Sequence, residues 1–112
     1  MDIFLVMKFE DYVIDMNGTK RWYNEVGELH RDENDLPAID QSDGTKSWYK
    51  NGKLHRENDL PAVEFFDGHK VWYKNGIKHR DNNLPAVEYA DGDKAWYLNG
   101  VCYRIDDWIY KL

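Results

Sequence analysis

The chain has very little cysteine, with Cys102 alone among its 112 residues. A single cysteine excludes an internal disulfide and is typical of proteins from reducing compartments. The sequence also lacks any apolar run near the roughly 20 residues that a membrane-spanning helix needs. The first residues show neither the basic segment nor the small-residue cleavage site of a signal peptide. We therefore expect a cytoplasmic protein.

Positive charge is also scarce. The 15 lysines and arginines are outnumbered by 21 aspartates and glutamates, which gives a formal net charge of −6. An acidic chain is repelled by the phosphates of nucleic acids and by anionic membrane surfaces. We expect neither direct nucleic-acid binding nor membrane binding.

Sequence motifs of catalysis are missing as well. The chain has no P-loop, dinucleotide-binding fingerprint, nucleophile elbow or CxxC zinc pattern. Neighbouring acids such as Asp106 and Asp107 are candidates for acid–base chemistry, but adjacent acids in loops usually face solvent. We expect that the chain is not an enzyme and that it has no catalytic residues, no cofactor and no bound metal.

Aromatic residues are abundant at 15%, and they recur at a fixed period. Four tryptophans are spaced by 26, 24 and 24 residues, and each follows a glycine by four positions. Asn-Gly follows three of them, and His-Arg and Leu-Pro-Ala recur further along each unit. This periodicity indicates a tandem-repeat protein.

The turn residues predict the fold of each repeat. Asn-Gly and Asp-Gly are strong signals for tight β-hairpins, and the segments between them are rich in β-forming residues. We predict an all-β fold, in which tandem antiparallel hairpin or meander repeats form one elongated, twisted sheet. The expected single domain, 1–112, comprises an N-terminal strand over 2–9, a C-terminal cap over 106–112, and units at 12–35, 36–59, 60–83 and 84–105.

Tight turns also predict which side chains share a face. If Asp67-Gly68 forms a two-residue loop, Val63 lies opposite Trp72, and Asn75-Gly76 places Trp72 opposite His79. The same arithmetic pairs Val13 with Trp22, Ile39 with Trp48 and Val87 with Trp96, and places Tyr103 opposite Trp96. The predicted structural core consists of Trp22, Trp48, Trp72, Trp96, His30, His55 and His79. Curling of the sheet or formation of a homodimer would cover this face.

The histidine column also has a functional interpretation, as a ladder of metal ligands or general bases. Each repeat supplies one histidine without a clustered second ligand, and Tyr103 replaces it in the last unit. We therefore favour packing of each ring on its tryptophan.

Strand alternation places a tyrosine column on the opposite face, together with acids and arginines. Tyrosine and arginine are frequent energetic anchors of protein interfaces. The predicted partner-binding residues are Tyr23, Tyr49, Tyr73, Tyr97, Arg56, Arg80, Glu64 and Glu88. The alternative is that these tyrosines only cover the second face of the sheet.

The repeated W-Y-x-N-G-x-x-H-R and L-P-A columns, preceded by D-G-x-K, resemble the variant MORN-type repeats of bacteriophage and giant-virus proteins. The resemblance covers about residues 12 to 105. It implies antiparallel hairpins packed side by side and a role in binding or scaffolding. The His-Arg pair departs from the usual MORN unit and, with the acidic charge, argues against lipid binding.

These observations favour a non-enzymatic protein-binding module, and the resemblance implies a phage- or virus-encoded inhibitor of a host defence or nucleic-acid-processing protein. Two alternatives stay open. One is a self-assembling scaffold that pairs through its edge strands, and the other is a sponge for small ligands or nucleotides.

Overall fold

The computed structural model describes residues 12–106, which are almost entirely β-strands and tight turns. The strands are β1 (Tyr12–Ile14), β2 (Lys20–Trp22), β3 (Ile39–Asp40), β4 (Lys46–Ser47), β5 (Tyr49–Lys50), β6 (Lys53–Leu54), β7 (Val63–Glu64), β8 (Lys70–Val71), β9 (Tyr73–Lys74), β10 (Ile77–Lys78), β11 (Val87–Glu88), β12 (Lys94–Leu98) and β13 (Val101–Asp106). One 3-10 turn, η1 (Glu33–Asp35), precedes β3.

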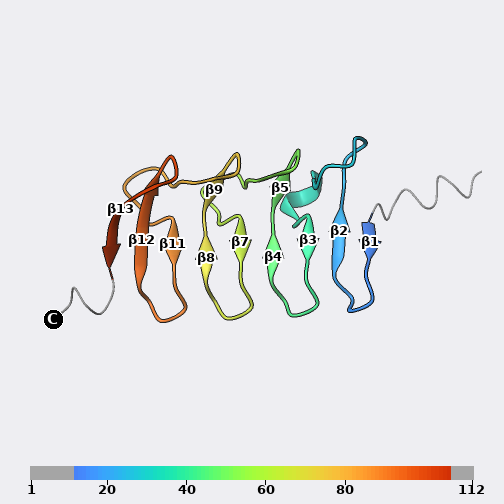
Figure 1. Ribbon diagram of the computed structural model, residues 1–112, viewed down its shortest axis with the longest axis horizontal. Coiled ribbons are helices and arrows are strands. Elements are labelled where there is room, and N and C mark those ends of the chain that lie inside the picture. Colours follow the sequence, from blue (N-terminus) through green and yellow to red (C-terminus); the bar gives the residue numbers. More distant parts are fainter. Residues whose placement is uncertain (1–11, 107–112) are drawn as a thin grey trace, which may run out of the picture.

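Nine strands form a single antiparallel sheet in the order β1-β2-β3-β4-β7-β8-β11-β12-β13. Figure 1 shows them side by side in one elongated layer, with the hairpin loops at one end of the strands. Two short two-stranded ribbons, β5–β6 and β9–β10, lie at the opposite end of these strands. The predicted all-β hairpin meander is therefore confirmed. The predicted strand at 2–9 lies outside the described residues, as does the predicted cap at 106–112 beyond Asp106.

The Asn-Gly turns have the predicted geometry. Asn51 and Gly52 both have positive φ, 49° and 83°, as a type I′ turn requires. The turn pairs Lys50 with Lys53, and the His55 N–H donates to the carbonyl of Trp48 at 3.0 Å. The predicted backbone pairing of His55 with Trp48 and of His79 with Trp72 along these ribbons is confirmed.

In the last unit, the tryptophan pairing was predicted wrongly. The ladder between β12 and β13 shifts register between Trp96 and Tyr97, and Arg104 pairs with Trp96 in place of Tyr103. A β-bulge inserts one extra residue in one strand, and a hairpin count that assumes regular pairing does not include it.

The Asp-Gly loops are one residue longer than predicted. Gly68 has a φ of 99°, but Asp67 does not have positive φ. The Gly68 N–H donates to the Phe65 carbonyl at 3.0 Å, and the Phe65 N–H donates to the backbone carbonyl of His69 at 2.9 Å. This is a three-residue loop, in which a turn is followed by a left-handed glycine.

The extra loop residue changes the register of the sheet. Val63 pairs with Val71, so the prediction that it faces Trp72 is wrong. The predicted partners of Trp22, Trp48 and Trp96 are wrong for the same reason: Val13 pairs with Arg21, Ile39 with Ser47 and Val87 with Ala95. Since side chains alternate along a strand, a slip of one residue exchanges the two faces.

One face of the sheet is apolar at its centre. Val63, Val71, Val87 and Ala95 are 3–9% exposed and form one cluster. Three partly buried side chains pack against this cluster: Leu54, Tyr73 and Tyr97. Residues of the same chain therefore cover this part of the sheet.

The other face carries a row of alternating charges across the sheet. Strand pairing places side by side Lys20, Asp40, Lys46, Glu64, Lys70, Glu88, Lys94 and Asp106. Each neighbour has the opposite sign, and such cross-strand pairs stabilise a sheet by roughly 0.2–1 kcal/mol each. The tryptophans project on this charged face.

The buried tryptophans give a first stability prediction. Trp72 is 7% exposed, and its indole N–H donates to the carbonyl of Asp59 at 3.0 Å. Trp72→Ala should lower the free energy of unfolding by about 3–5 kcal/mol, as a cavity left by a large aromatic ring does. Urea denaturation measures this change. Phe66→Ala, at a turn residue that is 68% exposed, is the control and should shift the midpoint little. A loss below about 1 kcal/mol for Trp72→Ala contradicts a structural role for this ring.

Candidate functional site

An arginine stacks on the tryptophan of every unit. The guanidinium carbon lies 3.7 Å from the ring centroid for Arg31 on Trp22, and 4.2 Å for Arg104 on Trp96. In the two middle units the same distance is 3.6 Å and 3.8 Å. Cation–π attraction of this kind contributes about 0.5–2 kcal/mol, with the higher values where water is excluded.

In the second unit, a loop of the first unit closes this stack. The Asp35 carbonyl accepts the Trp48 indole N–H at 2.9 Å. The Asp35 carboxylate accepts Nε and Nη2 of Arg56 at 3.1 Å and 2.8 Å. Arg56 Nη1 donates to Glu64 at 2.9 Å and to a backbone carbonyl. We call this arrangement, in which one aspartate binds both the tryptophan and the arginine of the next unit, the inter-unit clamp.

The third unit repeats the inter-unit clamp. Asp59 accepts the Trp72 indole N–H, and its carboxylate accepts Nε and Nη2 of Arg80 at 2.9 Å and 3.2 Å. Arg80 also donates to Glu88 at 3.3 Å. The Arg56 and Arg80 side chains are only 10% and 12% exposed. Their charge is therefore neutralised by other units of the same chain.

The histidine of each His-Arg pair, His30, His55 or His79, bridges two units. His55 Nδ1 accepts the backbone N–H of Asn75 at 3.1 Å, so Nε2 carries the proton and faces the carboxylate of Glu57. His30 and His79 make the same pair of contacts, with acceptor distances of 2.9 Å and 3.0 Å. These hydrogen bonds tie each ring to the Asn-Gly turn of the next unit. The described residues contain no group of three or more histidine, cysteine or acidic side chains placed to hold a metal ion.

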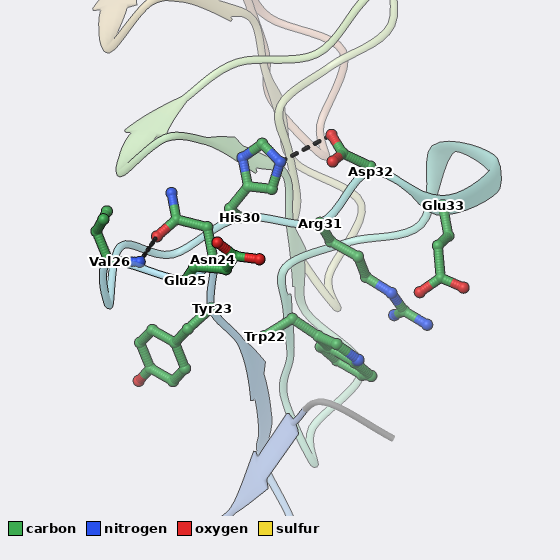
Figure 2. Close-up of a pocket in the computed structure, with 9 residues that line it drawn as sticks. All are labelled: Trp22, Tyr23, Asn24, Glu25, Val26, His30, Arg31, Asp32 and Glu33. Carbon is green, nitrogen blue, oxygen red and sulfur yellow. Dashed lines mark hydrogen bonds and ion pairs between the residues drawn. The ribbon is translucent and has the colours of Figure 1, made fainter. Parts of the chain in front are cut away.

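The first unit contains an open pocket, shown in Figure 2. It is an open hollow of about 530 Å³ beside Trp22, His30 and Arg31. The corresponding hollows beside Trp48 and Trp72 measure about 210 and 200 Å³, and the aspartates of the inter-unit clamps line them. Among residues 12–106, no aspartate of a preceding loop lines the N-terminal pocket.

The tyrosines lie on the apolar face, away from the stacked arginines. Tyr49, Tyr73 and Tyr97 are half-buried, whereas Tyr23 is 40% exposed. Burial raises the pKa of Tyr73 and Tyr97. The prediction that the tyrosines share one face with Arg56, Arg80, Glu64 and Glu88 is therefore wrong, because the one-residue shift places those charged groups beside the tryptophans.

The apolar face also holds an aromatic cluster that the sequence reasoning missed. The His69 ring contacts Phe65 and Tyr89 edge-on, with centroid separations of 6.2 Å and 5.3 Å. Phe65 and Tyr89 are 42% and 41% exposed. Phe65 and Tyr89 occupy the same position in successive repeats, 24 residues apart. Assigning three residues to the Asp-Gly loop would have predicted that they share a face with His69. We call Phe65, His69 and Tyr89 the aromatic patch.

Comparisons with known proteins found no matching family model, and no significant match to a curated protein or a solved structure. The MORN-type resemblance therefore rests on the repeat motif and stays a prediction. Within residues 12–106, no helix has the length and apolarity to cross a membrane.

The histidine–carboxylate pairs predict how acid affects stability. Hydrogen bonds from His55 and His79 lower the pKa of Glu57 and Asp81 below their usual values of 4.5 and 3.8. Ionised carboxylates thus stabilise the folded chain above about pH 4.5, and this contribution is lost as the pH falls through the lowered pKa values. We expect the melting temperature to drop between pH 5 and pH 3, and to drop less in a Glu57→Gln/Asp81→Asn variant.

Thermal denaturation monitored by circular dichroism across this pH range measures the effect. Glu25→Gln, which removes an exposed acid from the first unit, is the control and should follow the parent chain. Equal pH dependence in the double variant and the parent would show that these pairs do not contribute.

Proposed function

We propose that the chain is a non-enzymatic protein-binding module that contacts its partner through the apolar face, at the aromatic patch and the adjoining tyrosine column. The observation that carries this proposal is the exposure of Phe65 and Tyr89, which are 42% and 41% exposed beside a packed valine cluster. Exposed apolar groups gathered on one surface are typical of protein-interaction sites.

Two features favour this face over the charged one. Phenylalanine and tyrosine rings bury a large contact area at a small cost in conformational entropy, as interface anchors do. On the charged face, Arg56 and Arg80 already bind carboxylates of their own chain. A partner there would have to break these ion pairs to reach the arginines.

The repeat motif supports a finer version of this proposal. Its resemblance to viral MORN-type repeats favours a phage- or virus-encoded protein that acts in the host cytoplasm. An acidic module of 112 residues suits an inhibitor of a host defence or nucleic-acid-processing protein, since such enzymes often carry basic substrate-binding surfaces. In this version the aromatic patch supplies affinity, and the negative charge speeds association.

Affinity capture from a host lysate, followed by mass spectrometry and titration of the recovered protein, tests the aromatic patch. Phe65→Ala and Tyr89→Ala should each weaken binding by about tenfold or more, as loss of an interface anchor does. Lys70→Gln, on the charged face, should bind like the parent chain. Retained affinity in both aromatic variants, or an equal loss in Lys70→Gln, contradicts the assignment.

A further inference from the structure

We propose that the pocket between Trp22 and Arg31 binds an acidic segment of a partner protein, through a carboxylate that completes the inter-unit clamp. The site lies in the first unit, beside the arginine stacked on Trp22, whereas the aromatic patch is formed by Phe65, His69 and Tyr89 on the opposite, apolar face. It is therefore independent of the proposed function.

Arg31 is held in the same position as the arginines of the closed clamps. It stacks on Trp22 at 3.7 Å, and its Nη1 donates to the Pro37 carbonyl at 3.1 Å. Arg56 and Arg80 stack at 3.6 Å and 3.8 Å and make the equivalent proline contact. The guanidinium is therefore fixed before any ligand arrives, which reduces the entropic cost of binding.

Within the described part of the chain, Arg31 lacks the carboxylate hydrogen bonds that Arg56 and Arg80 make through Nε and Nη2. Its Nε is buried and has no hydrogen-bond partner among residues 12–106. In the closed clamps this Nε donates to Asp35 or Asp59. Burial also lowers the pKa of Arg31, with Glu33 and Asp40 acting in the opposite direction. A buried, unpaired donor on a cation is costly, and a carboxylate in the clamp position removes this cost.

The shape of the pocket fits such a ligand. Figure 2 shows the Arg31 guanidinium over the Trp22 indole, with His30 bonded to Asp32 above them. The hollow measures about 530 Å³, against about 200 Å³ where Asp59 lines the equivalent site. The difference leaves room for a short peptide turn.

The closed clamps define the chemistry of the ligand. Both are made by the sequence Glu-Asn-Asp-Leu-Pro, at 33–37 and 57–61, in which the Asn and Asp have positive φ. The aspartate supplies a carbonyl to the indole N–H and a carboxylate to the guanidinium. We therefore expect a partner that presents an Asp in a tight turn of this kind.

A second copy of the chain does not offer this ligand. Its Asp35 and Asp59 already bind the next units of their own array. The third loop has Asn83 in this position, and its side chain accepts the Tyr103 hydroxyl. Residues 1–11 contain no Asn-Asp-Leu-Pro sequence. These facts favour a different protein as the occupant.

The probe is a capped peptide with the sequence of residues 57–62, Glu-Asn-Asp-Leu-Pro-Ala, titrated into the full chain. NMR follows the Trp22 indole N–H and the Arg31 Nε–H, assigned with Trp22→Phe and Arg31→Lys variants. Both signals should shift saturably. The matched peptide with Asn in place of Asp should bind about tenfold more weakly, because it lacks the charged hydrogen bonds.

Two variants control the titration. Arg31→Lys keeps the charge but loses the planar pair of donors, and it should abolish saturable binding while preserving the remaining spectrum. Arg104→Lys, at the stack on Trp96, should bind the peptide normally. Phe65→Ala and Tyr89→Ala should also bind it normally, which separates this site from the aromatic patch.

Three results would overturn the proposal: no shift at Trp22 and Arg31 with millimolar peptide, equal binding of the Asn peptide, or unchanged binding by Arg31→Lys. The Glu10→Gln/Asp11→Asn variant is measured without peptide. If the Arg31 signal moves in this variant, the pocket belongs to the chain's own N-terminal segment, which would overturn the proposal as well. Shifts of these signals that depend on protein concentration alone would assign the pocket to a second copy of the chain and would also overturn the proposal.

Discussion

The stacked arginine that binds an aspartate of the preceding unit is the interaction on which this array depends. The sheet is one layer thick and its strands in the middle units are two residues long, so backbone pairing alone offers little stability. Each inter-unit clamp joins a loop aspartate to a tryptophan 13 residues further along the chain and to an arginine 21 residues further along. The same contacts explain why tryptophan, arginine and the Asp-Leu-Pro loop recur together, since none of them closes a clamp alone. Among residues 12–106, Arg31 is the stacked arginine whose buried Nε has no hydrogen-bond partner.

Loop length decides which residues share a face. Gly68 alone adopts positive φ in its loop, while Asn75 and Gly76 both do so in the next turn. The first loop therefore has three residues and the second has two. With this register, Val71 pairs with both Val63 and Val87, and a lysine meets an acid across every strand pair of the middle units. Like pairing on one face and opposite charges on the other make the register self-consistent, since a slip by one residue would set lysine against valine.

Much of the fold was predictable from local sequence, and much of the site was not. The Asn-Gly turns, the antiparallel meander and the pairing of His55 with Trp48 follow from turn chemistry and spacing. The Asp-Gly loop was assigned the wrong length because Asp-Gly fits both a two-residue and a three-residue loop. That error separated Arg80 from Trp72, which it contacts, and grouped it with Tyr73, which lies on the other face. Strand alternation could not predict the hydrogen bond that Arg80 donates to Asp59, since Asp59 lies in a loop whose residues have positive φ.

The coupling between Asp59 and Arg80 tests the clamp most directly. A double-mutant cycle with Asp59→Ala, Arg80→Ala and the double variant, measured by urea denaturation, isolates this pair from the stacking of Arg80 on Trp72. Since Arg80 is 12% exposed and Asp59 is 48% exposed, we expect a coupling free energy of about 1 kcal/mol, above that of a fully exposed pair. In the Asp59→Ala and Arg80→Ala variants, hydrogen exchange should show increased opening on both sides of the junction between the second and third units. A coupling below about 0.3 kcal/mol, with unchanged exchange, would contradict the view that these clamps hold the array together.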